Sequence, residues 1–180
     1  MLIHMKIPQN KIKINKICLI ALDIRSSENV GSFFRTGDAM GISHMYLVGI
    51  TPNVYDKFNK PNIKINKTAL GAENTIPSSY HKTITPLLKN LKKENFIILA
   101  LEQDKNSTDY REVIDQIQKV NKKNAPVNIA LILGNEVTGV PQKVLTQTDY
   151  IVEIPMRGQK ESLNVSVATG ITLAELTRTW

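Results

Sequence analysis

Residues 17–40 read ICLIALDIRSSENVGSFFRTGDAM, and the change of pattern within this stretch decides the fold. Its first six residues are all apolar, which is typical of a strand that is buried on both faces. After a polar loop, apolar residues recur at helical spacing from Asn29, the expected N-cap, to about Met40. A buried strand followed by an amphipathic helix is the repeating unit of parallel α/β sheets.

The same alternation continues along the chain. Short apolar runs predict further strands at residues 44–48, 96–101, 127–133 and 150–154. Helical patterns predict helices at residues 85–93, from about 107–109 to 120, and at 164–180. Within the long polar stretch 49–80, residues around 51–68 are predicted to form a long loop. We therefore expect an α/β fold with a mostly parallel sheet and helices on both faces, as a single domain of residues 17–180 after a short basic extension of residues 1–16.

The composition excludes several classes of protein. With 180 residues, 42% of them hydrophobic and 22% charged, the chain suits one globular domain rather than a disordered segment. The single cysteine, Cys18, lies in the first apolar run, which favours a core thiol over a disulfide framework. No apolar run approaches the length of a membrane span or suits a signal peptide, so we expect a cytoplasmic protein without a membrane partner. The histidines show no metal-ligand spacing, so no metal is expected.

The chain is basic, with 23 Lys and Arg against 16 Asp and Glu and a net charge of +7. The excess is clustered, which favours a polyanionic partner because each lysine can neutralise a phosphate and release counterions. A lysine surface that only keeps the protein soluble is the alternative. The cluster in the long polar stretch is the main candidate for a phosphate contact, and it consists of Lys57, Lys60, Lys64 and Lys67.

Three segments that follow predicted strands combine glycine with polar residues: 24–35, 131–141 and 154–166. In parallel sheets, ligands bind beyond the carboxyl ends of the strands, where such loops lead into helices. The second segment has neither the glycine spacing of a dinucleotide fingerprint nor the lysine of a P-loop. These segments therefore predict a ligand site at this edge of the sheet, but not a dinucleotide or P-loop site.

Each segment also has an ordinary structural explanation. Arg35, on the polar side of the first helix, could be solvated or could pair with Glu28. Glu136 could cap a turn, and Ser162 could do no more than begin the last helix. Taken one at a time, these residues leave the chemistry of the site open.

Taken together, the three segments resemble the SpoU (TrmH-like) RNA ribose 2′-O-methyltransferases of the SPOUT class. Asn29-x-Gly31-x-x-x-Arg35 resembles the first motif of that family, and residues 133–140, LGNEVTGV, resemble the second. Residues 154–158, IPMRG, with residues 162–168, SLNVSVA, resemble the third. Residues 67–73 and 100–103 are also similar to the family, so the resemblance extends over residues 17–178.

The resemblance implies a C-terminal deep trefoil knot, a homodimer, S-adenosylmethionine as cofactor, and methylation of a ribose 2′-hydroxyl of tRNA or rRNA. A non-catalytic RNA-binding protein that keeps the same fold is the alternative. The catalytic positions carried over from the family are Arg35, Asn29, Glu136, Ser162 and Asn164. The positions carried over for the cofactor are Leu101, Gly134, Ile154, Met156, Gly158 and Leu163.

Arg35 is the residue to which the family assigns the role of base. A guanidinium is effectively never deprotonated in a protein, so we expect Arg35 instead to grip the neighbouring phosphate and to stabilise developing negative charge. Deprotonation of the hydroxyl with the help of that phosphate is the other possibility. The sequence departs from the family in the short loop before Asn29, at Gly37 and at Ala174, none of which is a predicted catalytic position.

Overall fold

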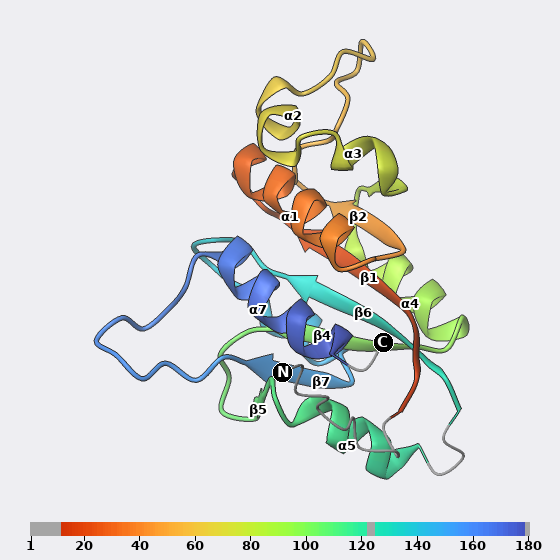
Figure 1. Cartoon of the computed structure of the whole chain (residues 1–180), viewed down its shortest axis with the longest axis vertical. Coiled ribbons are helices and arrows are strands. Elements are labelled where there is room, and N and C mark those ends of the chain that lie inside the picture. Colours follow the sequence, from red (N-terminus) through yellow and green to blue (C-terminus); the bar gives the residue numbers. More distant parts are fainter. Residues whose placement is uncertain (1–11, 122–124, 179–180) are drawn as a thin grey trace, which may run out of the picture.

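A seven-stranded sheet runs through the computed structural model, which describes residues 12–121 and 125–178 (Figure 1). Its order is β3-β2-β1-β6-β4-β7-β5, and every neighbouring pair of strands is parallel, which confirms the predicted α/β class. The strands are β1 (Ile14–Leu22), β2 (His44–Val48), β3 (Ser78–His81), β4 (Phe96–Leu101), β5 (Thr108–Asp109), β6 (Val127–Leu133) and β7 (Tyr150–Glu153).

Helices pack on both faces of the sheet, as predicted, and the sheet therefore divides the core into two clusters, one on each face. One cluster contains the buried sides of α1 (Ser27–Ala39), α2 (Ile63–Ala69), α3 (Ala72–Thr75), α5 (Val113–Val120) and α7 (Val165–Thr177). The other contains α4 (Ile84–Lys93) and α6 (Gln142–Leu145). None of the helices within the described ranges has the length and apolar character needed to cross a bilayer.

Strand β1 lies between β2 and β6 and is buried on both faces. Its alternate side chains enter the two core clusters, as strand geometry requires. Cys18 is one of them, and burial raises its pKa to about 11, so it is a protonated core thiol at neutral pH, as expected. The strand begins at Ile14, three residues before the predicted start, and Ile12 is buried with it.

The prediction of one long loop around residues 51–68 was wrong in its second part, where α2 begins at Ile63, and the rest of the polar stretch 49–80 contains α3 and the edge strand β3. These elements are too short to show a clear hydrophobic period; α2 buries only Ile65 and Ala69. Its start has a local signal in Asn62, whose side chain accepts hydrogen bonds from the backbone N–H groups of Lys64 and Ile65. The sequence analysis also missed two short elements, β5 and α6. It placed the start of α5 at about residues 107–109, whereas the helix begins at Val113.

The predicted helix starts were displaced by a few residues. Ser26, not Asn29, caps α1, and its Oγ accepts the backbone N–H of Asn29 at 3.1 Å. Asn164 caps α7, so Ser162 lies in the loop before that helix and does not begin it. Helix α4 begins after Thr83, which makes Pro86 its third residue rather than its first. In each case a neighbouring polar residue with the right backbone geometry takes the cap position.

Helix α2 packs closely on α1 because residue 31 is glycine. A Cβ built on Gly31 would lie 1.8 Å from Oγ1 of Thr68 and 2.6 Å from the carbonyl oxygen of Ile65. Both atoms belong to α2, and the carbonyl cannot move without moving the helix. Gly31 therefore sets the distance between the two helices.

We expect Gly31→Ala to lower the free energy of unfolding by about 1–3 kcal/mol, because overpacking forces the α2 backbone away from α1. Gly170→Ala is the matched control: it also places alanine in a helix, but the nearest atom to the new Cβ is 3.7 Å away. Denaturant unfolding followed by circular dichroism measures both. A Gly31→Ala protein as stable as the Gly170→Ala protein would contradict this account.

Candidate active site

A cavity of about 520 Å³ lies at the carboxyl ends of three adjacent strands, β6, β4 and β7. The loops that leave these strands form its walls, together with the segment that enters α7. The lining residues are the last residue of β4, Leu101, with Glu102 and Gln103; Gly134 to Val137 and Gly139 after β6; the last residue of β7, Glu153, with Ile154 and Met156; and Ser162 to Val165 and Ala168 before and within α7. The second and third segments selected from the sequence thus meet at one edge of the sheet, as predicted, whereas no residue of the first segment lines this cavity.

Asn29 joins the first segment to the other two. Its side-chain Nδ2 donates a hydrogen bond of 2.9 Å to Oε1 of Glu136, and its Oδ1 accepts one of 3.3 Å from Nδ2 of Asn164. Asn164 in turn accepts hydrogen bonds from the backbone N–H and the Oγ of Ser166, at 2.8 and 2.6 Å. Asn29 is only 9% exposed, so these hydrogen bonds satisfy a nearly buried amide.

Glu136 is held as a carboxylate. It accepts hydrogen bonds from the backbone N–H groups of Arg25 (2.9 Å) and Ser26 (3.1 Å) as well as from Asn29. Burial alone would raise the pKa of Glu136, but these hydrogen bonds favour the charged form and the net pKa is lowered. The ionised side chain therefore ties the loop after β6 to the N-terminus of α1.

Two residues after β4, which the sequence singled out only as similar to the family, hold the cavity walls together. Glu102 accepts hydrogen bonds from the backbone N–H groups of Val140 (2.7 Å) and Gln103 (2.9 Å). Glycine at position 139 leaves room for this carboxylate, because a Cβ at Gly139, where φ is +65°, would lie 2.1 Å from Oε2 of Glu102. Gln103 donates from Nε2 to the carbonyl oxygen of Glu161 at 2.8 Å and so ties down the loop between β7 and α7.

Arg35 does not line this cavity. It is exposed in a neighbouring groove of about 400 Å³, with Lys67 and Thr68 of α2 on one side and Ser166 of α7 on the other. Its predicted alternative partner, Glu28, instead forms an ion pair of 3.4 Å with Lys64. Since Asn164 and Val165 line the cavity and Ser166 lines the groove, the two depressions meet at the start of α7.

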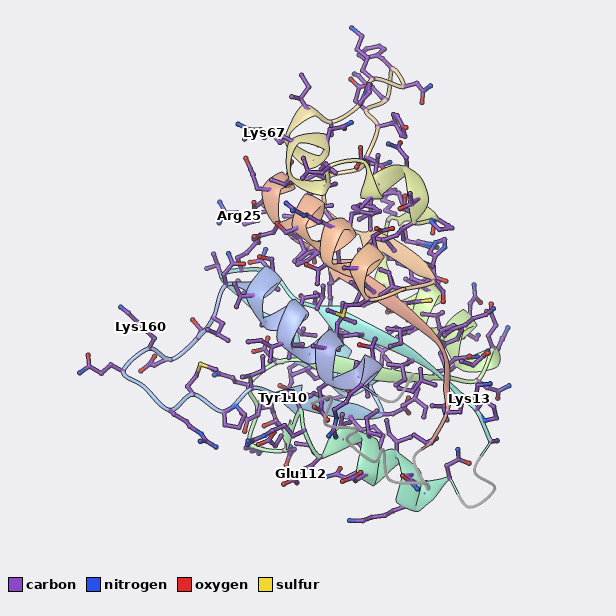
Figure 2. The ribbon with its side chains drawn as sticks, viewed as in Figure 1. Lys13, Arg25, Lys67, Tyr110, Glu112 and Lys160 are labelled. Carbon is purple, nitrogen blue, oxygen red and sulfur yellow. The ribbon has the colours of Figure 1, made fainter. Side chains whose placement is uncertain are left out.

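Most of the other predicted site residues line the cavity, but Gly158 and the four lysines do not. The predicted cofactor positions Leu101, Gly134, Ile154, Met156 and Leu163 all line the cavity, as does Ser162. Gly158 does not: it lies on the outer part of the loop between β7 and α7, the loop that carries Lys160 (Figure 2). Lys57 and Lys60 precede α2, whereas Lys64 and Lys67 lie on that helix rather than on a loop.

A model of the SpoU rRNA Methylase family matches residues 16–174. The chain is 32% identical over 161 residues to the 23S rRNA (guanosine-2′-O-)-methyltransferase RlmB of Neisseria meningitidis serogroup B, covering 89% of this chain and 58% of that protein. It is 29% identical over 158 residues to the tRNA (guanosine(18)-2′-O)-methyltransferase of Escherichia coli, covering 86% of this chain and 60% of that protein. The chain thus spans about three fifths of the length of these relatives.

Solved structures show the same fold. The TrmH/SpoU tRNA modifying enzyme of A. aeolicus matches with a TM-score of 0.72 and 28% identity, over 93% of this chain and 77% of that chain. The AdoMet-bound rRNA methyltransferase of Sinorhizobium meliloti matches with a TM-score of 0.74 and 24% identity, over 93% of this chain and 58% of that chain.

The hydrogen bonds of Glu136 predict a pH-dependent contribution to stability. Because folding lowers the pKa of Glu136, its contribution is fully present above the ordinary glutamate pKa of about 4.3 and is lost as the pH falls through the lowered value. Glu136→Gln presents an amide to three donors, so we expect it to reduce the free energy of unfolding by about 1–2 kcal/mol at neutral pH. The difference from the unmodified protein should shrink in acid.

Urea unfolding over a range of pH measures this difference. Glu161→Gln is the matched control, since Glu161 lies on the exposed outer loop and contributes its backbone carbonyl to the contact with Gln103. An equal loss in both variants, or a loss that does not depend on pH, would show that Glu136 does not act as described.

Proposed function

The chain belongs to the SpoU rRNA methylase family, and we propose that it transfers a methyl group from S-adenosylmethionine to a ribose 2′-hydroxyl of RNA. The observation that carries the proposal is the network of Glu136, Asn29 and Asn164, which joins the three family motifs between a cavity and a cationic groove. The relatives named above act on 23S rRNA and on tRNA, so the proposed substrate is one of these two RNA classes.

The cavity suits S-adenosylmethionine. Its volume of about 520 Å³ lies within the range of small-molecule sites, roughly 300–1,000 Å³. Leu101, Ile154 and Leu163 offer apolar surface for the adenine, and the carboxylates of Glu102 and Glu153 offer acceptors for hydroxyl and amine groups. When bound, the cofactor supplies an electrophilic methyl group; the protein has to hold it, orient it and exclude water.

In the proposed mechanism Arg35 and the groove bind the RNA backbone. The Arg35 guanidinium can form two parallel hydrogen bonds to a phosphate, and Lys67 adds a second cation to the same groove. Positive charge at this position also stabilises the negative charge that develops on the 2′-oxygen. Asn164 orients Ser166 in the groove wall, and Asn29 holds Asn164, so both asparagines act by positioning.

Other parts of the proposal rest on the sequence or on the surface of the protein. A homodimer is supported by α7, whose residue Val167 is an apolar side chain that is 50% exposed beside the Arg35 groove. The proposal also includes a trefoil knot and a cytoplasmic location, both of which rest on the sequence alone. A role for Ser162 in the site and a contact between Gly158 and the cofactor rest on the sequence in the same way.

The first test is methyl transfer itself. The purified protein, incubated with methyl-labelled S-adenosylmethionine and RNA from cells that lack such modifications, should place label on ribose 2′-oxygens, which nuclease digestion and chromatography of the nucleosides will show. We expect Arg35→Ala to lower turnover by about 10²–10³-fold, because it removes the charge that stabilises the transition state. Cofactor affinity, measured by calorimetry, should not change, because Arg35 lies outside the cavity.

The conservative variant tests how Arg35 works. Arg35→Lys keeps the charge and loses the two-pronged contact, so its turnover should stay well below that of the unmodified protein. Near-normal turnover would contradict the phosphate grip. Label on bases alone, or cofactor and RNA binding without any transfer, would favour the non-catalytic RNA-binding alternative.

The lysine cluster makes a separate prediction about salt. Binding of single-stranded RNA should weaken with salt by about 0.7 in log affinity per log salt for each phosphate neutralised. Replacing Lys57, Lys60, Lys64 and Lys67 by Gln should therefore flatten this slope by about two to three, while cofactor binding stays the same. A salt titration by fluorescence anisotropy measures the slope.

The control variant removes the same number of charges elsewhere on the surface. It replaces by Gln four exposed lysines of α4, α5 and α6: Lys89, Lys93, Lys119 and Lys143. Its slope should stay near that of the unmodified protein. Equal slopes for both four-lysine variants would mean that the cluster serves only solubility.

A further inference from the structure

The large aromatic side chains that are exposed in the described part of the chain belong to two neighbouring segments, the loop before α2 and strand β3. Tyr55, Phe58 and Tyr80 are 42%, 70% and 49% exposed, and they are the three exposed large aromatic residues of the described ranges. Tyr55 and Phe58 lie on the loop before α2, and Tyr80 lies on the edge strand β3. Exposed aromatic rings that gather in this way point to a binding surface.

Two of these rings, Tyr55 and Tyr80, line a hollow of about 640 Å³, which we call the tyrosine hollow. Phe58 is not a lining residue, but it follows the lining residue Lys57 in the same loop. The walls of the hollow include Tyr55 and Tyr80 with Pro52, Pro61, Ile63 and Lys64. It lies at the end of the molecule formed by α2 and the loop before it, at the top of Figure 1. It is separate from the cavity at the ends of β6, β4 and β7, with which it shares no lining residue.

Both tyrosine rings are held in place by their hydroxyl groups. The hydroxyl of Tyr80 donates to the carbonyl oxygen of Gly49 at 2.8 Å, and that of Tyr55 donates to Oδ1 of Asn74 at 3.4 Å. The loop itself is closed by a backbone bridge between Tyr55 and Pro61. The rings are therefore presented at fixed positions, which reduces the entropy lost when a flat ligand stacks on them.

Two lysines line the tyrosine hollow. The Nζ of Lys57 lies 5.0 Å from the centre of the Phe58 ring, and Lys64 forms the exposed ion pair with Glu28. The one carboxylate in the wall of the hollow, Asp56, is turned toward its own turn, where Oδ1 accepts the backbone N–H groups of Phe58 and Lys60, both at 2.8 Å. Flat rings between lysines suit a ligand that combines planar apolar groups with negative charge, which is the chemistry of unpaired nucleic acid.

Helix α2 connects this surface to Arg35. Lys64 lines the tyrosine hollow, and Lys67, one turn further along the same helix, lines the groove of Arg35. The close packing at Gly31 fixes α2 against the helix that carries Arg35. A single strand whose phosphate is held at Arg35 can therefore follow the lysines of α2 to the tyrosine hollow.

We propose that the tyrosine hollow is a stacking site for an unpaired base of the RNA strand, a few nucleotides from the ribose in the active site. This inference rests on the RNA-binding part of the proposed function and extends it. It states that the substrate presents single-stranded nucleotides beside the modified one, because bases within a duplex are already stacked and cannot enter the hollow.

The test is binding of two RNA probes without cofactor: a fluorescein-labelled unpaired strand of about 12 nucleotides, within the roughly 4–16 nucleotides that single-strand binding sites cover, and the blunt duplex of the same sequence. Tyr55→Ala, Phe58→Ala and Tyr80→Ala should each weaken binding of the unpaired strand by about 5- to 150-fold, the loss of one stacked base. Duplex affinity should not change, and neither should the salt slope, because the rings neutralise no phosphate.

The matched controls are Tyr55→Phe and Tyr80→Phe, which keep the rings, and Val120→Ala, which removes an exposed apolar side chain from α5. Val120→Ala should bind like the unmodified protein. The two phenylalanine variants keep the rings and lose only the hydroxyl hydrogen bonds that hold them, so they should lose much less affinity than the alanine variants. Circular dichroism melting of each variant reports folding, and the largely exposed Phe58 gives a substitution that leaves the core untouched.

Two results would overturn the inference. The alanine variants could bind the unpaired strand as well as the unmodified protein does, or they could lose a self-association that light scattering detects, which would make the tyrosine hollow a protein interface. The outcome is distinct from that of the methyl-transfer test. Transfer without dependence on the rings removes this inference alone, whereas binding that depends on the rings without transfer removes the proposed reaction.

Discussion

The hydrogen bond between Asn29 and Glu136 is the contact on which the rest of the site depends. Strands β1 and β6 are neighbours, with Ala21 opposite Leu133, so the loops that follow them leave the sheet side by side. The amide of Asn29 is nearly buried, and leaving it without partners would cost free energy, so the two loops and Asn164 are bound to one arrangement. The first segment thereby acts as one unit with two segments that lie more than a hundred residues further along the chain.

The same helix that carries Asn29 also carries Arg35, and this determines how the site is divided. Asn29 is in the first turn of α1, and Arg35 is nearly two turns further, beyond the edge of the cavity. Gly31, between them, allows α2 to approach and to place Lys67 beside Arg35. Helix α1 thus takes part in both regions: Asn29 is hydrogen-bonded to Glu136 and Asn164, which line the cavity, and Arg35 lines the cationic groove.

The sequence predicted the strands best, because a strand buried on both faces is a continuous apolar run; β2, β4 and β6 have the predicted bounds. It missed α2, α3 and β3, whose few buried residues carry no period, and it placed the α1 cap at Asn29, where Ser26 has the better geometry. It found the cavity walls, since they follow strands directly. It could not pair Asn29 with Glu136, because that contact depends on the register of β1 and β6.

The groove also bears on where the proton of the 2′-hydroxyl goes in the proposed reaction. The described residues that line it are Ser32, Arg35, Thr36, Lys67, Thr68, Ser166 and Val167, and none of them is His, Asp or Glu. Glu136, the carboxylate of the network, lines the cavity and not the groove, and its oxygens already accept three hydrogen bonds. Arg35 cannot accept a proton either. The acceptor that fits this groove is a phosphate oxygen of the RNA itself, gripped and oriented by Arg35, which unites the two roles considered for that residue.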